Sequence, residues 1–304
     1  MLNGKVYIAG HTGLAGSALV RRLSDCDLIL RSHEELDLCD PKQVKTFFRE
    51  VKPRYVFVAA GLVGGIQANA MSPAQFLRDN LLIATNVIHE ACHYETEKLL
   101  YLASSCMYPR LCPQPMQEES LLSGPFESNT EGYALSKIVG LKLARAYRKQ
   151  YGFNAITAIP TNLYGPNDNY HLESSHVIPA LIAKICEAEE EVVIWGTGKP
   201  RREFLHSDDL ADACVHLMEN YDDMRPINVG CGYDLSIREL AELIGRIVGF
   251  KGRYRYDTSK PDGAPRKLLD VSKLKLLGWE AKIDLETGLR RTIADKRHTY
   301  CRVS

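Results

Sequence analysis

Short apolar runs alternate with helical patterns of apolar residues along the first half of the chain. The predicted elements are strands at 6–9, 27–30, 55–59 and 98–103 and helices that include 41–50 and 73–93. Strands that alternate with helices form a parallel sheet with helices on both faces. We therefore expect a doubly wound α/β domain of the Rossmann type over residues 1–165.

The second half of the chain predicts a smaller unit. A helical pattern covers 177–190, an apolar run covers 192–195, and a polar loop follows at 196–202. We expect residues 166–304 to form a mixed α/β domain that binds the substrate and partly interleaves with the first domain.

The composition excludes some classes of partner. Lysine plus arginine and aspartate plus glutamate number 38 each among 304 residues, so no bulk charge attracts nucleic acid or an anionic membrane. No apolar run suits a membrane span and no signal-peptide pattern precedes the first strand, so we expect a cytoplasmic protein. The nine cysteines have no metal-ligand spacing, which favours free thiols and implies neither a metal nor disulfides.

A glycine-rich turn lies between the first strand and a helical pattern. Gly10 permits a tight turn, Gly13 lets the backbone approach a pyrophosphate, and Gly16 lets the helix pack close to the strand. The N-terminus of the helix then faces the phosphates. This turn predicts dinucleotide binding. A second glycine pair, Gly64–Gly65, leaves room for either a ligand or a sharp turn.

The end of the second predicted strand bears on the choice of cofactor. Arg31 stands where an NAD site usually carries an acidic residue against the ribose 2′-hydroxyl. A cation suits a 2′-phosphate, so the favoured cofactor is NADP (NADPH), with NADH as the alternative. Arg31 also fits a solvated strand end, and Glu34 and Glu35 follow it closely.

Tyr133 and Lys137 lie four residues apart in a helical pattern, so the phenol and the ammonium project from one face. A close ammonium favours the phenolate and is expected to lower the pKa of the phenol toward neutrality. Such a pair exchanges a proton with a sugar hydroxyl or carbonyl. A solvated helix face that carries both residues is the alternative.

The fourth predicted strand leads into Ser104-Ser105-Cys106. Ligands of a doubly wound sheet lie over the C-terminal strand ends, so these side chains point into the crevice. The Ser104 hydroxyl can hold the reacting oxygen while Tyr133 exchanges its proton and Lys137 grips the nicotinamide ribose. The serines also fit a simple turn.

Together, Gly-x-x-Gly-x-x-Gly, Ser-Ser-Cys-x-Tyr-Pro and Tyr-x-x-x-Lys resemble the extended short-chain dehydrogenases/reductases. Within that superfamily the chain is similar to the GDP-L-fucose synthase family from Val6 to about Trp279. The more specific motifs are Val63-Gly64-Gly65-Ile66, Pro160-Thr161-Asn162-Leu163-Tyr164-Gly165-Pro166, Ser175-His176-Val177-Ile178-Pro179-Ala180, Arg202-Glu203-Phe204-Leu205-His206 and Lys260-Pro261-Asp262-Gly263.

The resemblance implies conversion of GDP-4-keto-6-deoxy-D-mannose to GDP-L-fucose, by C3/C5 epimerisation and then NADPH-dependent reduction of the C4 ketone. It makes Ser104, Tyr133 and Lys137 the reductase set, and Cys106 and His176 the acid/base pair for epimerisation. A thiol and an imidazole need little adjustment of their pKa values for such proton transfers. Without the resemblance, Cys106 fits a small buried residue and His176 a loop histidine.

The resemblance also implies the binding residues. Those for the cofactor are Gly10, His11, Thr12, Gly13, Leu14, Ala15, Gly16, Arg31, His33, Leu36, Leu102, Ala103, Ser104, Ser105, Tyr133, Lys137, Pro160, Thr161, Asn162, Leu163 and His176. For the GDP-sugar substrate, Lys184 and Arg202 meet the diphosphate, Trp195 lines the guanine site and Asp262 helps to bind the nucleotide. A core tryptophan and a surface ion pair are the alternatives for Trp195 and Asp262.

The chain departs from the family pattern in a few places. Thr12 stands where many relatives carry arginine, and His33 where some do, which predicts only a modest preference for NADPH. Leu62 and residues 130–132 also differ, and both changes could mark another deoxysugar. The alternatives are a C4 reductase of a related GDP-4-keto-deoxysugar or deoxyheptose without full epimerisation, and a non-catalytic dinucleotide sensor. The family implies a homodimer built from residues 73–93 and 131–151.

Overall fold

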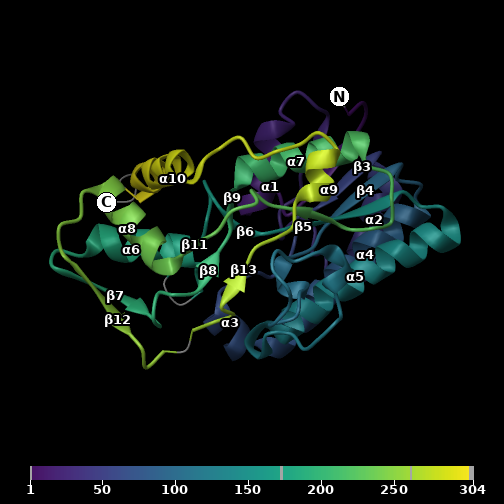
Figure 1. The fold of residues 1–304 in the computed structure, drawn as a ribbon. Helices are drawn as coiled ribbons and strands as arrows, with labels where there is room; N and C mark the ends of the chain where they lie inside the picture. The colour runs from purple at the N-terminus through teal and green to yellow at the C-terminus, as the bar shows by residue number, and fades with distance from the viewer. Residues whose placement is uncertain (1, 172–173, 261, 301–304) are drawn as a thin grey trace.

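The computed structural model of the protein describes residues 2–171, 174–260 and 262–300, so Pro261 of the last motif lies outside the described residues. Its centre is a six-stranded sheet of order β10-β5-β4-β3-β1-β2 in which every pairing is parallel (Figure 1). The strands are β1 (Val6–Ala9), β2 (Leu28–Ile29), β3 (Tyr55–Val58), β4 (Lys98–Leu102), β5 (Ala155–Pro160) and β10 (Ile227–Val229). The prediction of a doubly wound α/β fold is confirmed.

Helices cover both faces of this sheet. One face packs against α2 (Pro41–Val51), α4 (Pro73–His93) and α5 (Glu131–Tyr151), and the other packs against α1 (Leu14–Arg22) and α7 (Ser207–Asn220). The predicted helix at 73–93 has the bounds that the structure gives α4, and its first residue is a proline, which suits the first turn of a helix.

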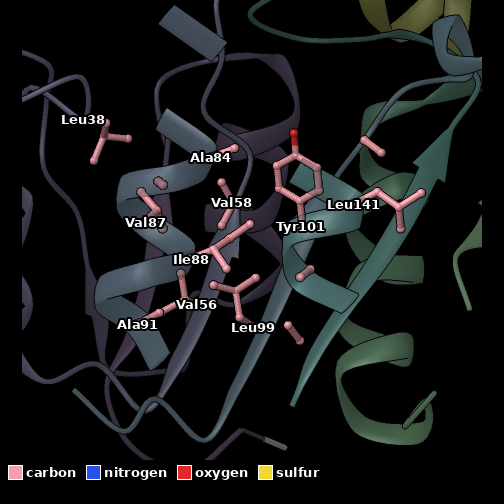
Figure 2. Close-up of a cluster of buried hydrophobic side chains, with 14 of the residues drawn as sticks. Leu38, Val56, Val58, Ala84, Val87, Ile88, Ala91, Leu99, Tyr101 and Leu141 are labelled. Atoms are coloured by element: carbon pink, nitrogen blue, oxygen red, sulfur yellow. The ribbon is translucent and has the colours of Figure 1, made fainter. Parts of the chain in front are cut away.

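Successive side chains along β4 enter different cores. Leu99 and Tyr101 belong to the core under α2, α4 and α5, whereas Leu100 and Leu102 belong to the core under α1 and α7. Figure 2 shows the first of these cores, in which side chains of α4 meet those of β3 and β4. Burial on both faces explains why these strands are continuous apolar runs in the sequence.

A buried lysine attaches α7 to the sheet. Lys98, at the start of β4, donates from Nζ to the carbonyl oxygens of Met218 and Tyr221, each at 2.6 Å. The last carbonyls of a helix have no partner within it, so the lysine satisfies groups that would otherwise be buried without hydrogen bonds. The chain then enters β10, which lies beside β5. Residues beyond 165 therefore contribute a helix and an edge strand to the large sheet.

The other elements surround the C-terminal edge of the sheet or lie to one side of it (Figure 1). They are α3 (Ile66–Met71), α6 (Val177–Glu187), α8 (Ile237–Val248), α9 (Ser272–Leu276), α10 (Leu285–Tyr300), β6 (Asn162–Tyr164), β7 (Glu191–Trp195), β8 (Arg201–Arg202), β9 (Phe204–His206), β11 (Leu235–Ser236), β12 (Arg253–Asp257), β13 (Arg266–Lys267) and the 3-10 turns η1 (Ser105–Met107), η2 (Glu118–Ser120) and η3 (Ser128–Thr130). A third core joins α6, α8 and α10.

One predicted helix is shorter than expected. The helical pattern suggested 177–190, but α6 ends at Glu187 and Ala188 is already extended, with ψ of 137°. Glu187, Glu189 and Glu190 lie at or just past this end. Acidic side chains are unfavourable near the negative end of the helix dipole, which explains the early end.

Candidate active site

The glycine turn has the geometry of a dinucleotide site. Gly10 has φ of +80°, and a Cβ atom at this position would lie 2.6 Å from the Cα of Ala60. A Cβ atom on Gly16 would collide with the carbonyl of Gly10, so only glycine lets α1 pack so close to β1. Gly13 precedes the first helical residue, Leu14, and a Cβ atom on Gly13 would have only the Gly10 carbonyl within 4 Å. The space and the exposed helix N-terminus fit a pyrophosphate.

Arg31 and His11 both lie near Glu35 at the end of β2, where a ribose 2′-phosphate would lie. Arg31 is exposed, and its guanidinium donates to the carbonyl of Leu30 at 2.8 Å. The Nδ1 atom of His11 is buried without a hydrogen-bond partner among the described residues. Hydrogen bonds with Ser32 lower the pKa of Glu35, and the charges of Arg31 and His11 lower it further. Glu35 therefore carries a negative charge that offsets part of this positive region.

Ser104, Cys106 and Tyr133 come together at the C-terminal end of β4. The Ser104 hydroxyl oxygen accepts from the backbone N–H of Cys106 at 3.2 Å, and this hydrogen bond caps the N-terminus of η1. Tyr133 is 8% exposed. Burial raises the pKa of Tyr133, nearby Cys106 raises it further, and a hydrogen bond with Ser104 lowers it. The predicted meeting of strand end and helix is therefore present in the fold.

The expectation that Lys137 lowers the pKa of Tyr133 is wrong for this structure. Lys137 donates from Nζ to the carbonyl of Leu102 at 3.0 Å, and Nζ lies 5.7 Å from the centre of the Tyr133 ring. Spacing along the helix puts both side chains on one face, but the loss of water around the phenol outweighs the distant ammonium. The same burial lowers the pKa of Lys137 to about 8.

Arg202, one of the residues predicted to bind the substrate, lies near this cluster. Its guanidinium donates to the carbonyl of Arg201 at 2.7 Å. Burial lowers the pKa of Arg202, while Cys106, Glu127 and Asp262 oppose that shift through their charges. A cation on β8 is thus close to the thiol that follows β4, although the two residues are far apart in the sequence.

Trp195 lies at the end of β7 and is 50% exposed, so it is not a core tryptophan. The Nζ atoms of Lys184 and Lys260 lie 4.7 and 5.6 Å from its ring centre. Asp262 accepts from the backbone N–H of Thr197 at 2.9 Å and from its hydroxyl at 2.6 Å. An exposed indole beside two ammonium groups suits a nucleotide base and its phosphates.

His176 is the residue just before α6, and its side chain reaches solvent. Enough protein surrounds it that desolvation lowers its pKa. The preceding loop is joined to the glycine pair, because the N–H of Gly65 donates to Ser174 O at 2.9 Å. A Cβ atom on Gly65 would lie 2.6 Å from Ser175 O. The close approach of two chain segments therefore explains this glycine.

The other predicted cofactor residues differ in burial and in the elements that carry them. Leu36, Leu102, Ala103 and Ser105 are buried, Thr12 and His33 are exposed, Ala15 is part of α1, Pro160 ends β5, and Leu163 is in β6. The side chains of Thr161 and Asn162 both donate to the backbone carbonyl of Glu203, at 3.2 and 2.9 Å.

The sequence motifs gave no role to Glu203 or Lys260, although both residues lie within them. The Glu203 carboxylate is fully buried and accepts from the N–H groups of Gly232 and Leu269, at 2.7 and 2.9 Å. It thereby ties β9 to the loops after β10 and β13, next to Arg202. Burial raises the pKa of Glu203, and the hydrogen bonds oppose that shift.

Two kinds of feature are absent from the part of the chain that the structure describes. No helix there is long and apolar enough to cross a membrane. No group of three or more histidine, cysteine, aspartate or glutamate side chains there could hold a metal ion.

A family model described as the NAD dependent epimerase/dehydratase family matches residues 6–230, and the chain belongs to this family. It is 52% identical over 297 residues to GDP-L-fucose synthase 1 of Arabidopsis thaliana, covering 95% of this chain and 92% of that one. It is 48% identical over 308 residues to GDP-L-fucose synthase of Escherichia coli strain K12, covering 96% of each. Within the family, the chain thus belongs with the GDP-L-fucose synthases.

A solved structure also resembles this chain over nearly its whole length. The GDP-mannoheptose C4 reductase from Campylobacter jejuni with NADP bound is 39% identical, with a TM-score of 0.90 over 98% of this chain and 99% of that one. The likeness therefore extends over both the large sheet and the elements beside it.

Proposed function

We propose that the protein is a GDP-L-fucose synthase, which converts GDP-4-keto-6-deoxy-D-mannose to GDP-L-fucose by C3/C5 epimerisation and then C4 reduction. The observation that carries this proposal is the convergence of Ser104, Cys106 and Tyr133 with Arg202. A reductase alone needs the serine and the tyrosine. The thiol and the cation beside them suit an enzyme that also moves protons on a diphosphate sugar.

The proposed cofactor is NADPH. The glycine turn from Gly10 to Gly16 and the N-terminus of α1 would hold its pyrophosphate, Arg31 would meet the 2′-phosphate, and Lys137 the nicotinamide ribose. When bound, it supplies the hydride that reduces C4. Glu35 and the absence of arginine at Thr12 and His33 support a modest preference over NADH.

Tyr133 would donate a proton to the C4 oxygen during reduction. Because burial raises its pKa, the phenol stays protonated at neutral pH and is ready to donate. An alkoxide that forms on C4 is more basic than the phenolate, so the transfer is favourable even without a lowered pKa. Ser104 would hold the same oxygen, and the Lys137 ammonium would stabilise the negative charge left on the phenol.

Cys106 and His176 would carry out the epimerisation. The C4 ketone acidifies the protons on C3 and C5, so one group removes each proton and the other returns a proton to the opposite face. Cys106 lies two residues after Ser104, close to the reacting oxygen, and His176 reaches the solvent side of the site from the start of α6. We assign the base to Cys106 and the acid to His176.

The nucleotide would lie between Trp195 and Arg202. The exposed indole suits stacking on guanine, Lys184 and Arg202 suit the diphosphate, and Asp262 suits donor groups of the base or ribose. We also propose a domain boundary near residue 165, with β10 and α7 returning to the first domain.

A homodimer in the cytoplasm is part of the proposal. The exposed apolar side chains Leu135 and Val139, which lie four residues apart on one face of α5, support an interface formed by α4 and α5.

The test of the main proposal is incubation with GDP-4-keto-6-deoxy-D-mannose and NADPH, followed by NMR of the product sugar. A fucose product is expected. Unchanged configuration at C3 and C5 would instead support a C4 reductase, which the likeness to the Campylobacter jejuni reductase makes the second candidate. Binding of NADPH without turnover would support a dinucleotide sensor.

The epimerase residues have a separate test. Without NADPH, the enzyme should exchange the C3 and C5 protons of the keto sugar for solvent deuterium. Cys106→Ser should nearly stop this exchange, because a hydroxyl ionises far less readily than a thiol, and His176→Asn should block inversion. Both variants should still reduce the ketone. Unimpaired exchange in both would end the assignment of these two residues.

A further inference from the structure

Tyr101 is a buried aromatic residue next to the reductase residues. It lies on β4, is 1% exposed, and its hydroxyl has no hydrogen-bond partner among the described residues. Figure 2 shows the ring beside Leu141, with the hydroxyl oxygen pointing away from Leu99. Buried tyrosines usually satisfy their hydroxyl. A hydrogen bond of the hydroxyl therefore does not explain why a tyrosine occupies this position.

The polar contact that Tyr101 does make is through its ring. Nζ of Lys137 lies 5.1 Å from the ring centre, within the range of a cation–π interaction. Leu102, the next residue of β4, supplies the carbonyl that accepts from the same Nζ at 3.0 Å. Two consecutive residues of one strand thus hold one ammonium.

Helix α5 makes room for this ring. A Cβ atom on Gly140 would collide with the Cζ and hydroxyl atoms of Tyr101. Gly140 lies three residues after Lys137, on the same side of the helix. Glycine is unfavourable in the middle of a helix, so its presence here has a packing reason. Because residue 140 of the helix has no side chain, the Tyr101 ring can lie beneath Lys137.

The groups around Lys137 explain why an aromatic ring would stabilise its buried charge. Burial lowers the pKa of Lys137 to about 8. The groups around the ammonium are the rings of Tyr101 and Tyr133, the Leu102 carbonyl, and Gly61 with Asn80 behind it. None of these is an acidic side chain. An aromatic face is then one of few groups that can replace the water lost around the cation.

We propose that Tyr101 is a positioning residue whose ring, with the Leu102 carbonyl, keeps the Lys137 ammonium charged and at a fixed distance from Tyr133. This inference rests on the proposed function, because it assigns Lys137 to the C4 reduction. The positioning role requires the aromatic ring of Tyr101 and not its hydroxyl. The reductase step should depend on it, whereas epimerisation by Cys106 and His176 should not.

The experiment compares Tyr101→Leu with Tyr101→Phe. In Tyr101→Leu, kcat for C4 reduction at saturating NADPH should fall about tenfold, the effect of one desolvated cation–π contact. NADPH affinity, measured by its fluorescence, should also weaken, because a displaced Lys137 ammonium would no longer meet the nicotinamide ribose. Tyr101→Phe keeps the ring and should retain wild-type kcat and affinity. Deuterium exchange at C3 and C5 without NADPH should be unchanged in both variants.

Leu99→Ala is the matched control, because Leu99 lies on the same strand and in the same core, whereas the ring contacts of the Lys137 ammonium are with Tyr101 and Tyr133. It should lower stability without changing the ratio of reduction to exchange. If Tyr101→Leu does not fold, Gly140→Ala should displace the ring and give the same selective loss of reduction.

Three results would overturn the inference: wild-type reduction in Tyr101→Leu, an equal loss in Tyr101→Phe, or a parallel loss of exchange and reduction. If the wild-type protein neither exchanges nor reduces the keto sugar, the proposed function fails instead. In that case the NADPH affinity still tests the positioning role of Tyr101, because unchanged NADPH binding in Tyr101→Leu would contradict that role.

Discussion

The residues proposed for the reduction and those proposed to bind the nucleotide sugar differ in how deeply they are buried. Tyr133 and Lys137 are 8% and 5% exposed and come from one helix that packs on the large sheet. Trp195 is 50% exposed and Asp262 lies in an exposed loop, where hydrogen bonds from Thr197 hold its carboxylate. The first region is therefore organised by the protein core, and the second by contacts at the surface.

This difference in burial sets how strongly the pKa values of the two regions are shifted. In the buried region the loss of water raises the pKa of Tyr133 and lowers that of Lys137. Beside Trp195, Lys260 is exposed, whereas Lys184 is half-buried and burial also lowers its pKa. Changes in the buried region should thus alter the rate of chemistry, whereas changes near Trp195 should alter substrate binding. Arg202 belongs to both regions, since Cys106 and Asp262 both act on its charge.

The largest expected effect is that of Tyr133→Phe. The ring would keep its edge contact with Phe76, whose centre lies 6.5 Å away, but the proton donor would be lost. C4 reduction, followed by NADPH oxidation, should fall by about two orders of magnitude or more. Cofactor binding should survive the change. Near-native reduction in this variant would contradict the division between the two regions.

The second prediction concerns the pH dependence of reduction. The pKa of Lys137 is lowered to about 8, so the ammonium is charged below that pH and becomes neutral above it. If its charge is needed, kcat should fall with rising pH above about 8, by about tenfold per unit. Lys137→Arg carries a permanent charge and should lose this alkaline decline, even if its rate is lower. A wild-type rate that stays flat well above pH 8 would contradict the assignment.

A smaller effect is expected at the exposed indole. Trp195→Ala should raise the KM for the GDP-sugar about tenfold, because stacking of one base on an aromatic side chain contributes roughly this much. Its kcat and thermal stability should change little, since the side chain is half exposed. Trp195→Phe should recover part of the affinity. A drop in kcat with unchanged KM would show that the indole takes part in the chemistry instead.

The smallest effect should come from Arg31→Ala. The exposed guanidinium would lose its contact with the 2′-phosphate, so the ratio of kcat/KM for NADPH to that for NADH should fall by a few-fold, as expected for an exposed ion pair. The value for NADH should stay the same. A wild-type preference for NADH would show that Arg31, at the end of β2, does not select the cofactor.

Patterns that depend on neighbouring residues were sufficient to predict most of the large sheet from the sequence. The apolar runs of β1, β3 and β4 were predicted to within one residue, because strands buried on both faces are continuous in sequence. The strand-turn-helix at Gly10 was equally clear, since its glycines serve the backbone itself. The end of α6 was less clear, because an apolar pattern alone does not include the effect of Glu187 and the acidic residues after it.

The sequence by itself determined which residues are candidates for the chemistry, and the tertiary structure decided the surroundings and the protonation of those residues. The spacing of Tyr133 and Lys137 predicted a shared helix face, but the direction of the phenol's pKa depends on how much water the fold removes, which spacing does not encode. Likewise, nothing local to Tyr101 indicated that its ring lies beside Lys137, and nothing near Cys106 indicated Arg202. These contacts join segments far apart in the chain, and only the packed sheet and helices bring them together.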